Sequence, residues 1–205
     1  MHLRRNSFVL LTMLVVATCV LSAQQKSTNG YPGHQEVNLA VTYTEQYSNL
    51  VSTPTFWYNG GDIELSAQVY HGLGLAANIG GTQTGNAAGS GVGLTLITAT
   101  FGPRYTFYRA VGAERKRSLA IFGQGLIGQA WGLNSYFPST SGAQTDAVNF
   151  ALQVGGGVDL GLTRHLGVRV FQGDWLRTQL PNGTTNVQNT LRLGAGVVFR
   201  FPQNR

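Results

Sequence analysis

The 205-residue chain is poor in charged residues and in cysteine. Only 11% of its residues are charged, against about a quarter in soluble domains, while 42% are hydrophobic. The single cysteine, Cys19, lies in an N-terminal apolar segment, so no disulfide is available to the rest of the chain. With so few charges, the surface of the folded protein must be apolar somewhere.

Long hydrophobic runs are absent beyond that N-terminal segment. Residues 1–23 have a basic start, an apolar stretch and the small pair Ser22-Ala23, which is the pattern of a cleaved signal peptide. No later segment approaches the roughly 18 consecutive apolar residues of a membrane helix. An exported chain of this kind can span a membrane only with strands, and we expect residues 24–34 to form a periplasmic N-terminal segment.

Neither the charge nor the metal-binding residue types indicate a nucleic acid or a metal. The formal net charge is +6, which falls to +4 without the signal residues Arg4 and Arg5, and the excess is dispersed along the chain. Histidines and cysteines form no cluster and the acidic residues are scattered. We therefore expect no nucleic-acid partner, no metal and no other cofactor.

The segment from Thr190 to Phe201 has the clearest pattern in the chain. One face of this expected strand carries Leu191, Leu193, Ala195, Val197, Phe199 and Phe201. The other face carries Arg192, Gly194, Gly196, Val198 and Arg200. An apolar stripe opposite arginines and glycines is typical of a strand with lipid on one side and a polar barrel lumen on the other.

Alternation with a period of two recurs eight times, and no stretch has a convincing helical period. The expected strands are about 36–47, 61–70, 73–81, 92–107, 118–133, 147–162, 166–178 and 190–201. The fourth is expected to be irregular. A change of apolar parity predicts a bulge near Ile97, and Pro103, which has no N–H, predicts a further bulge or a slipped pair.

The links between these strands alternate in length. Those after the first, third, fifth and seventh strands are long and polar, whereas those after the second and sixth have two or three residues. The link at 108–117, after the fourth strand, is an exception because it is longer and basic. Short periplasmic turns and longer external loops are typical of outer-membrane barrels, and this arrangement places both termini in the periplasm.

On these residues the chain resembles the eight-stranded outer-membrane β-barrel family and is similar to the transmembrane domain of outer-membrane protein A. The resemblance covers about residues 35–201 and is densest at 154–159, 167–169, 174–175 and the last strand. It implies an all-β, up-and-down antiparallel barrel at 35–202, in contact with outer-membrane lipid and inserted by the barrel assembly machinery. The C-terminal assembly signal of the family is matched here by Gly196, Phe199 and Phe201.

Charged residues also stand on the inward parity of the expected barrel. They are Asp62, Glu64, Arg104, Asp159, Arg169, Arg192 and Arg200. Buried charges persist only when they are paired and hydrogen-bonded, so we predict an interlocked ion-pair network that plugs the lumen. Four arginines against three carboxylates leave this plug incomplete without water or anions. The alternative is that the same residues line a narrow water-filled path.

Aromatic residues cluster near the expected ends of the strands. Toward the loops lie Tyr43, Trp57, Trp131 and Trp175, and toward the periplasm lie Tyr105 and Phe107. We predict that they form two aromatic girdles, one at each membrane interface.

The positions of the histidines do not favour an enzyme. His71 and His165 lie in expected periplasmic turns, so neither is available to activate a serine of the external loops. Asp146 and Asp174, which are expected in or near those loops, have no base partner. The sequence therefore predicts no catalytic residue.

The pattern favours a non-enzymatic outer-membrane barrel with a largely plugged polar lumen, which strengthens the envelope or binds an unidentified ligand through its loops. Three alternatives stay open: a narrow small-solute pore, a lipid-modifying barrel enzyme and a soluble periplasmic carrier like a lipocalin. The last would turn its apolar residues inward to hold a ligand and its arginines outward.

Overall fold

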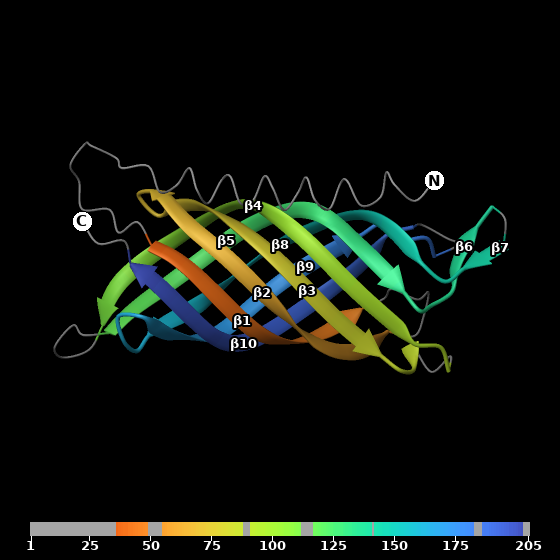
Figure 1. Ribbon diagram of the computed structural model, residues 1–205, viewed down its shortest axis with the longest axis horizontal. Coiled ribbons are helices and arrows are strands. Elements are labelled where there is room, and N and C mark those ends of the chain that lie inside the picture. Colours follow the sequence, from red (N-terminus) through yellow and green to blue (C-terminus); the bar gives the residue numbers. More distant parts are fainter. Residues whose placement is uncertain are drawn as a thin grey trace.

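The computed structural model describes residues 36–48, 55–87, 91–111, 117–140, 142–182 and 186–202. Its strands are β1 (Glu36–Ser48), β2 (Phe56–Tyr70), β3 (Leu73–Thr84), β4 (Leu94–Val111), β5 (Arg117–Leu133), β6 (Phe137–Ser139), β7 (Gly142–Gln144), β8 (Ala147–Gly161), β9 (Leu166–Thr178) and β10 (Gln188–Pro202). All of them except β6 and β7 close into one antiparallel barrel, in the order β1-β10-β9-β8-β5-β4-β3-β2 (Figure 1). The predicted eight-stranded barrel is confirmed. The predicted signal peptide and the segment 24–34 lie outside the described residues.

The two ends of the barrel differ. Figure 1 shows short connections at one end, which we call the turn end, and longer ones with the β6–β7 hairpin at the other, the loop end. β1 begins and β10 finishes at the turn end. The expected long link after the fourth strand is wrong, because β4 continues to Val111 and β5 begins at Arg117, which leaves only 112–116 between them.

The barrel is apolar outside and polar inside. In β10, Val197 is 40% exposed whereas Arg192 is 1% exposed, and the same alternation runs around the wall. A lipocalin-like carrier requires the opposite orientation, so this alternative is excluded. The barrel strands have 12 to 18 residues, more than the roughly 9–11 with which a tilted strand crosses a bilayer. Among the described residues, no helix has the length and hydropathy of a transmembrane span.

Neither irregularity predicted for β4 takes the expected form. The pairing of β3 with β4 shows no register shift along its length, so the predicted bulge near Ile97 is wrong. Instead Leu94 and Leu96 face the lumen and are buried there. On the β5 side the pairing lapses at Gly102 and Pro103 and resumes in the same register, which accommodates the missing N–H of Pro103 without a slipped pair.

The irregularity that shapes the lumen lies in β9. The pairing of β9 with β8 skips one residue, Val170, and both Val170 and Phe171 face outward. This β-bulge changes the phase of the strand. Arg169 before it and Gln172 and Asp174 after it therefore all point into the lumen, although a regular strand would place Arg169 and Gln172 on opposite faces.

Candidate functional site

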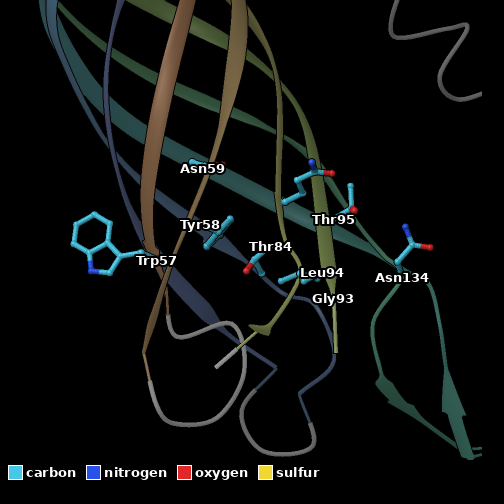
Figure 2. A pocket seen from close by; sticks show the side chains of 10 residues that line it. Trp57, Tyr58, Asn59, Thr84, Gly93, Leu94, Thr95 and Asn134 are labelled. Atoms are coloured by element: carbon cyan, nitrogen blue, oxygen red, sulfur yellow. The ribbon is translucent and has the colours of Figure 1, made fainter. Parts of the chain in front are cut away.

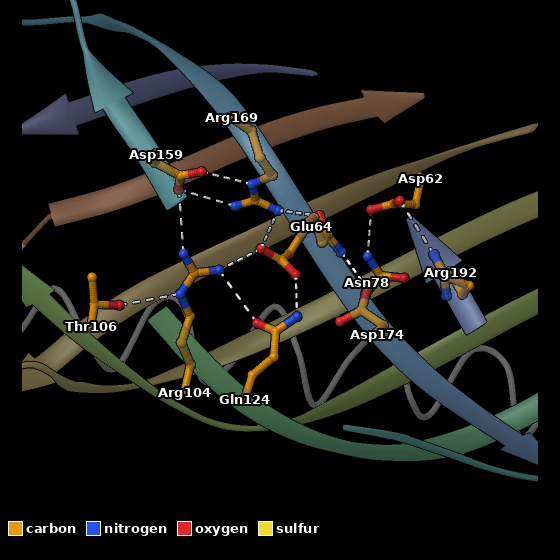
Figure 3. Close-up of polar contacts among 11 residues, drawn as sticks. Asp62, Glu64, Asn78, Arg104, Thr106, Gln124, Asp159, Arg169, Asp174 and Arg192 are labelled. Carbon is orange, nitrogen blue, oxygen red and sulfur yellow. Dashed lines mark hydrogen bonds and ion pairs between the residues drawn. The ribbon is translucent and has the colours of Figure 1, made fainter. Parts of the chain in front are cut away.

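Glu64 on β2 is the centre of an ion-pair network inside the barrel (Figure 3). Its Oε1 accepts hydrogen bonds from Arg104 on β4 and from Arg169 on β9, the latter at 3.0 Å. Its Oε2 accepts a third from Gln124 Nε2 at 2.7 Å. The carboxylate is buried and both of its oxygens accept hydrogen bonds, so side chains from three other strands, β4, β5 and β9, meet at this residue of β2.

Asp159 on β8 completes this central network. Arg169 donates to it from Nε at 2.8 Å and from Nη2 at 3.2 Å, a bidentate pair, and Arg104 lies 3.5 Å away on its other side. Beneath both guanidinium groups lies the ring of Phe122, whose centroid is 3.6 Å from Arg104 Cζ and 4.5 Å from Arg169 Cζ. Two arginines, two carboxylates and an aromatic ring therefore fill the cross-section.

A second ion pair lies between the central network and the loop end. Arg192 on β10 donates to Asp62 on β2 at 3.2 Å and to Gln153 on β8 at 3.3 Å. Asn78 on β3 donates to the same aspartate at 2.7 Å. A Cβ at Gly80 would lie 2.9 Å from Thr98 Oγ1 and 3.3 Å from Arg192 Nη2, so this glycine leaves room for the arginine.

Asp174 belongs to the lumen, and the prediction that placed it at a loop is wrong. It is 1% exposed on β9 and accepts a hydrogen bond from Gln172 at 2.6 Å. Gln172 in turn accepts one from Arg169, which links Asp174 to the central network. With Asp174 inside, the buried side chains of the described strands include four carboxylates and four arginines, so their formal charges balance.

Arg200 stands apart from the other predicted lumen residues. It lies at the turn end, where it donates to Ser118 on β5 at 2.5 Å and sits 3.8 Å from the carboxylate of Glu36 on β1. The structure thus divides the predicted set into a central network, the Asp62–Arg192 pair and this separate contact at the turn end.

The loop end of the lumen is filled by apolar side chains that the sequence analysis missed. We call this group the apolar cap; it consists of Phe56, Tyr58, Ala87, Leu94, Leu96, Ala130, Phe137, Ala147, Ala151, Leu176 and Leu180. Most stand on the inward parity of strands whose other inward residues are polar. The inward positions of β4 change from polar to apolar toward Leu94, and this change of environment, rather than the predicted bulge near Ile97, explains the parity of Leu94 and Leu96.

The β6–β7 hairpin contributes Phe137 to the cap. Its ring is buried against Gly132 of β5, where an added Cβ would collide with it. The turn before the hairpin requires a left-handed residue, and Asn134 adopts φ 57° there. Tyr136, on the other side of the hairpin, is 70% exposed. One aromatic side chain therefore anchors the hairpin to the loop end of the barrel.

The outer wall carries the aromatic residues predicted for the girdles. Tyr43, Trp57 and Trp175 are exposed in the loop half, Trp131 is half-buried there, and Tyr105 and Phe107 are exposed toward the turn end. Trp57 also packs against Tyr47, with ring centroids 5.1 Å apart. Of the predicted assembly-signal residues, Phe199 and Phe201 face outward on β10 and Gly196 is half-buried. Their role in assembly stays a prediction.

A cleft of about 520 Å³ opens at the loop end, between the ends of β2, β3 and β4 (Figure 2). Its lining consists of Trp57, Tyr58, Asn59, Gln83, Thr84, Gly85, Gly93, Leu94, Thr95 and Asn134. None of these residues is charged. The cleft shares Tyr58 and Leu94 with the apolar cap and opens outward from them, so it is accessible while the lumen is closed.

Solved structures with the same architecture are known. The crystal structure of Ail, the attachment invasion locus protein of Yersinia pestis, superposes with a TM-score of 0.51 at 12% identity, covering 82% of this chain and 100% of Ail. Neisserial surface protein A gives a TM-score of 0.56 at 13% identity, covering 80% of this chain and 97% of that protein. The chain has the fold of an eight-stranded outer-membrane β-barrel. No family model and no curated protein matches the sequence.

The apolar outer wall of this barrel is the kind of surface that a membrane-spanning barrel presents to lipid. Its interior offers little for catalysis in the part that the structure describes. No group of three or more acidic, histidine or cysteine side chains there could hold a metal ion. The His165 carbonyl accepts the N–H of Arg200 at the turn end, whereas Ser135 lies at the loop end next to Thr145, so this histidine and this serine stand at opposite ends of the barrel.

Replacing Gly132 by alanine should lower the free energy of unfolding by about 1–3 kcal/mol, because the new methyl group overlaps the Phe137 ring and forces it to move. Urea titration of the barrel in lipid vesicles, followed by tryptophan fluorescence, measures the change. Gly81→Ala is the matched control, since an added Cβ there has nothing within 4 Å. Equal stability of both variants would show that Phe137 is not held against β5.

Proposed function

We propose that this chain is a non-conducting, non-enzymatic outer-membrane barrel that contributes to the envelope and binds ligands at its loop end. The observation that carries the proposal is the double closure of the lumen, by the Glu64-centred network and by the apolar cap. The loop end, with its hairpin and its open cleft, is then the part of the barrel that is free to meet a ligand.

The two closures obstruct ions in different ways. At the central network, the guanidinium groups of Arg104 and Arg169 lie on Phe122 and are held by carboxylates from two other strands, in a barrel just wide enough for side chains. At the apolar cap, Phe56, Leu96 and Leu176 belong to a buried apolar cluster, and an apolar constriction excludes water and ions. A narrow pore would require both to open together.

Conductance in planar lipid bilayers tests the proposal. The refolded barrel, whose closed state is first verified by heat-modifiable migration in gel electrophoresis, should produce no steady channel above the baseline of the bilayer. A porin refolded in the same way is the positive control. Steady openings of porin size from the folded fraction would overturn the plugged barrel and favour the small-solute pore.

The links at the loop end lack the basic residues that a protein needs to bind anionic ligands. The links at 49–55, 85–93, 134–146 and 179–187 contain no lysine or arginine, and Asp146 is their one acidic residue. One of the solved structures similar to this chain shows Ail with the heparin analogue sucrose octasulfate, at 14% identity. The uncharged links here offer no comparable cationic partner for sulfate groups, so we do not extend that ligand to this barrel.

A further inference from the structure

The cleft at the loop end forms where β2 extends past its last paired residue on β3. β2 pairs with β1 as far as Phe56–Ser48, but its pairing with β3 stops at Asn59–Gln83. Residues 56–58 thus extend beyond the end of β3 with a strand partner on one side only among the described strands. The notch that remains, closed on its far side by the start of β4, is the cleft.

The cleft offers neutral hydrogen-bonding groups over an apolar floor. Tyr58 and Leu94, both buried members of the apolar cap, form its base. Its sides carry the amides of Asn59, Gln83 and Asn134 and the hydroxyls of Thr84 and Thr95, some of which Figure 2 shows grouped at the end of the barrel. Amides and hydroxyls both donate and accept hydrogen bonds, as the hydroxyls of a sugar do.

Several of these polar groups are available to a ligand. The side chains of Gln83, Thr95 and Asn134 make no hydrogen bond with any other described residue. Asn59 faces outward, where its amide contacts the Tyr43 hydroxyl, and that hydroxyl donates a hydrogen bond to the Glu45 carboxylate at 2.6 Å. The nearby acid is therefore already engaged, and the lining itself stays uncharged.

An aromatic surface adjoins the cleft. The Trp57 ring projects from the outer wall (Figure 2) and packs against Tyr47, whose hydroxyl donates to Thr55 at 2.7 Å. Trp57 is 56% exposed, so one face of the pair is open. Rigid, exposed aromatic rings present apolar faces, and the ring carbons of a saccharide are a matching apolar surface.

From these features we propose that the cleft between β2, β3 and β4 binds a neutral saccharide, with amide and hydroxyl groups of Asn59, Gln83, Thr95 and Asn134 as its hydrogen-bonding partners. The uncharged links and lining disfavour a phosphate, a sulfated glycan or a cation. The proposal rests on the proposed function, because it names the ligand class of the loop end. It does not depend on whether the lumen conducts.

The test is a titration of the isotopically labelled full barrel in nanodiscs, followed by NMR of the side-chain amides and the indole N–H. The probes are sucrose, lactose and diacetylchitobiose, with sucrose octasulfate as the charged counterpart of sucrose. We expect saturable shifts at Asn59, Gln83 and Asn134 with at least one neutral sugar, and no stronger response to the octasulfate. No saturable shift with any neutral sugar, or tighter binding of the octasulfate, would overturn the proposal.

Variants test whether the cleft itself binds. Gln83→Ala combined with Asn134→Gly, which keeps the left-handed turn, removes two hydrogen-bonding groups and should weaken binding about tenfold. Gln179→Ala removes an exposed amide at the loop end outside the cleft and should leave the affinity unchanged. Equal weakening by the two variants, or no weakening by either, would place the sugar elsewhere and reject the cleft.

The sugar can reach the cleft as a soluble saccharide or as the headgroup of an outer-leaflet glycolipid. Nanodiscs with and without such a glycolipid separate these sources. If the amide signals are already shifted in the glycolipid nanodisc, the lipid-borne sugar occupies the cleft; if only the added sugar shifts them, the ligand is soluble. Conductance measured on the same samples shows separately whether the proposed closed barrel fails.

Discussion

Replacing Glu64 by alanine should destabilise the barrel by about 3–5 kcal/mol, because it leaves two buried guanidinium groups without their shared carboxylate. Arg104 and Arg169 both donate to Glu64, and Gln124 donates to its second oxygen. Asp159 alone would then hold both arginines. The free energy of unfolding, obtained from urea titration in lipid vesicles, measures the loss.

A matched control is available on the outer wall. Glu45 is also a strand glutamate, but it is half-exposed and accepts one hydrogen bond, from Tyr43. Glu45→Ala should change the stability by less than about 1 kcal/mol, as for a single solvent-exposed contact. If Glu64→Ala costs no more than Glu45→Ala, the central network does not hold the barrel together.

Deleting Gly173 from β9 should prevent assembly of the barrel. The bulge already holds two consecutive residues, Val170 and Phe171, outward, so removal of Gly173 leaves no arrangement that keeps every side chain on its own face. Either Asp174 turns toward lipid and Trp175 into the lumen, or the bulge is lost and Phe171 turns inward while Gln172 turns toward lipid. A buried polar side chain moved into lipid loses its hydrogen-bonding partners, and an added aromatic ring does not fit among the packed lumen side chains. The measurement is the fraction of heat-modifiable, folded protein after refolding into vesicles, which we expect to fall close to zero.

A deletion of the same size in the loop controls for this experiment. Thr140 lies in the link between β6 and β7, where it is exposed, and its removal changes the phase of no barrel strand. The Thr140 deletion should refold like the wild type. Normal refolding of the Gly173 deletion would show that the strand faces of β9 do not depend on the residue count after the bulge.

The alternation of polar and apolar residues predicted the two faces of the barrel wall well, because one face of each strand contacts lipid and the other faces the polar lumen. Leu193 and Val197 were expected outside and Arg192 inside, and the structure has this orientation. The bounds of β9, 166–178, were also predicted without error. Both predictions rest on many alternating positions, so one irregular position does not change them.

Predictions from the alternation were wrong where the chain departs from regular strand geometry or where the lumen changes from polar to apolar. Asp174 has the parity of the lipid face if β9 is counted from Arg169, and only the bulge at Val170 returns it to the lumen. Leu94 and Leu96 have a parity that suggests a bulge, but they are apolar because the loop end of the lumen is apolar. A local pattern cannot distinguish a change of phase from a change of environment.

By itself, the sequence determined the number of strands, the direction in which their faces point and the residues available to fill the interior, because these follow from a two-residue repeat between lipid and lumen. Tertiary structure alone decided which charges meet. Closure of the barrel brings Glu64, Arg104, Asp159 and Arg169 from four separate strands within hydrogen-bonding distance, and brings Phe137 onto Gly132. These contacts depend on the register, twist and bulges of all the barrel strands together, so they cannot be predicted from any one segment of the chain.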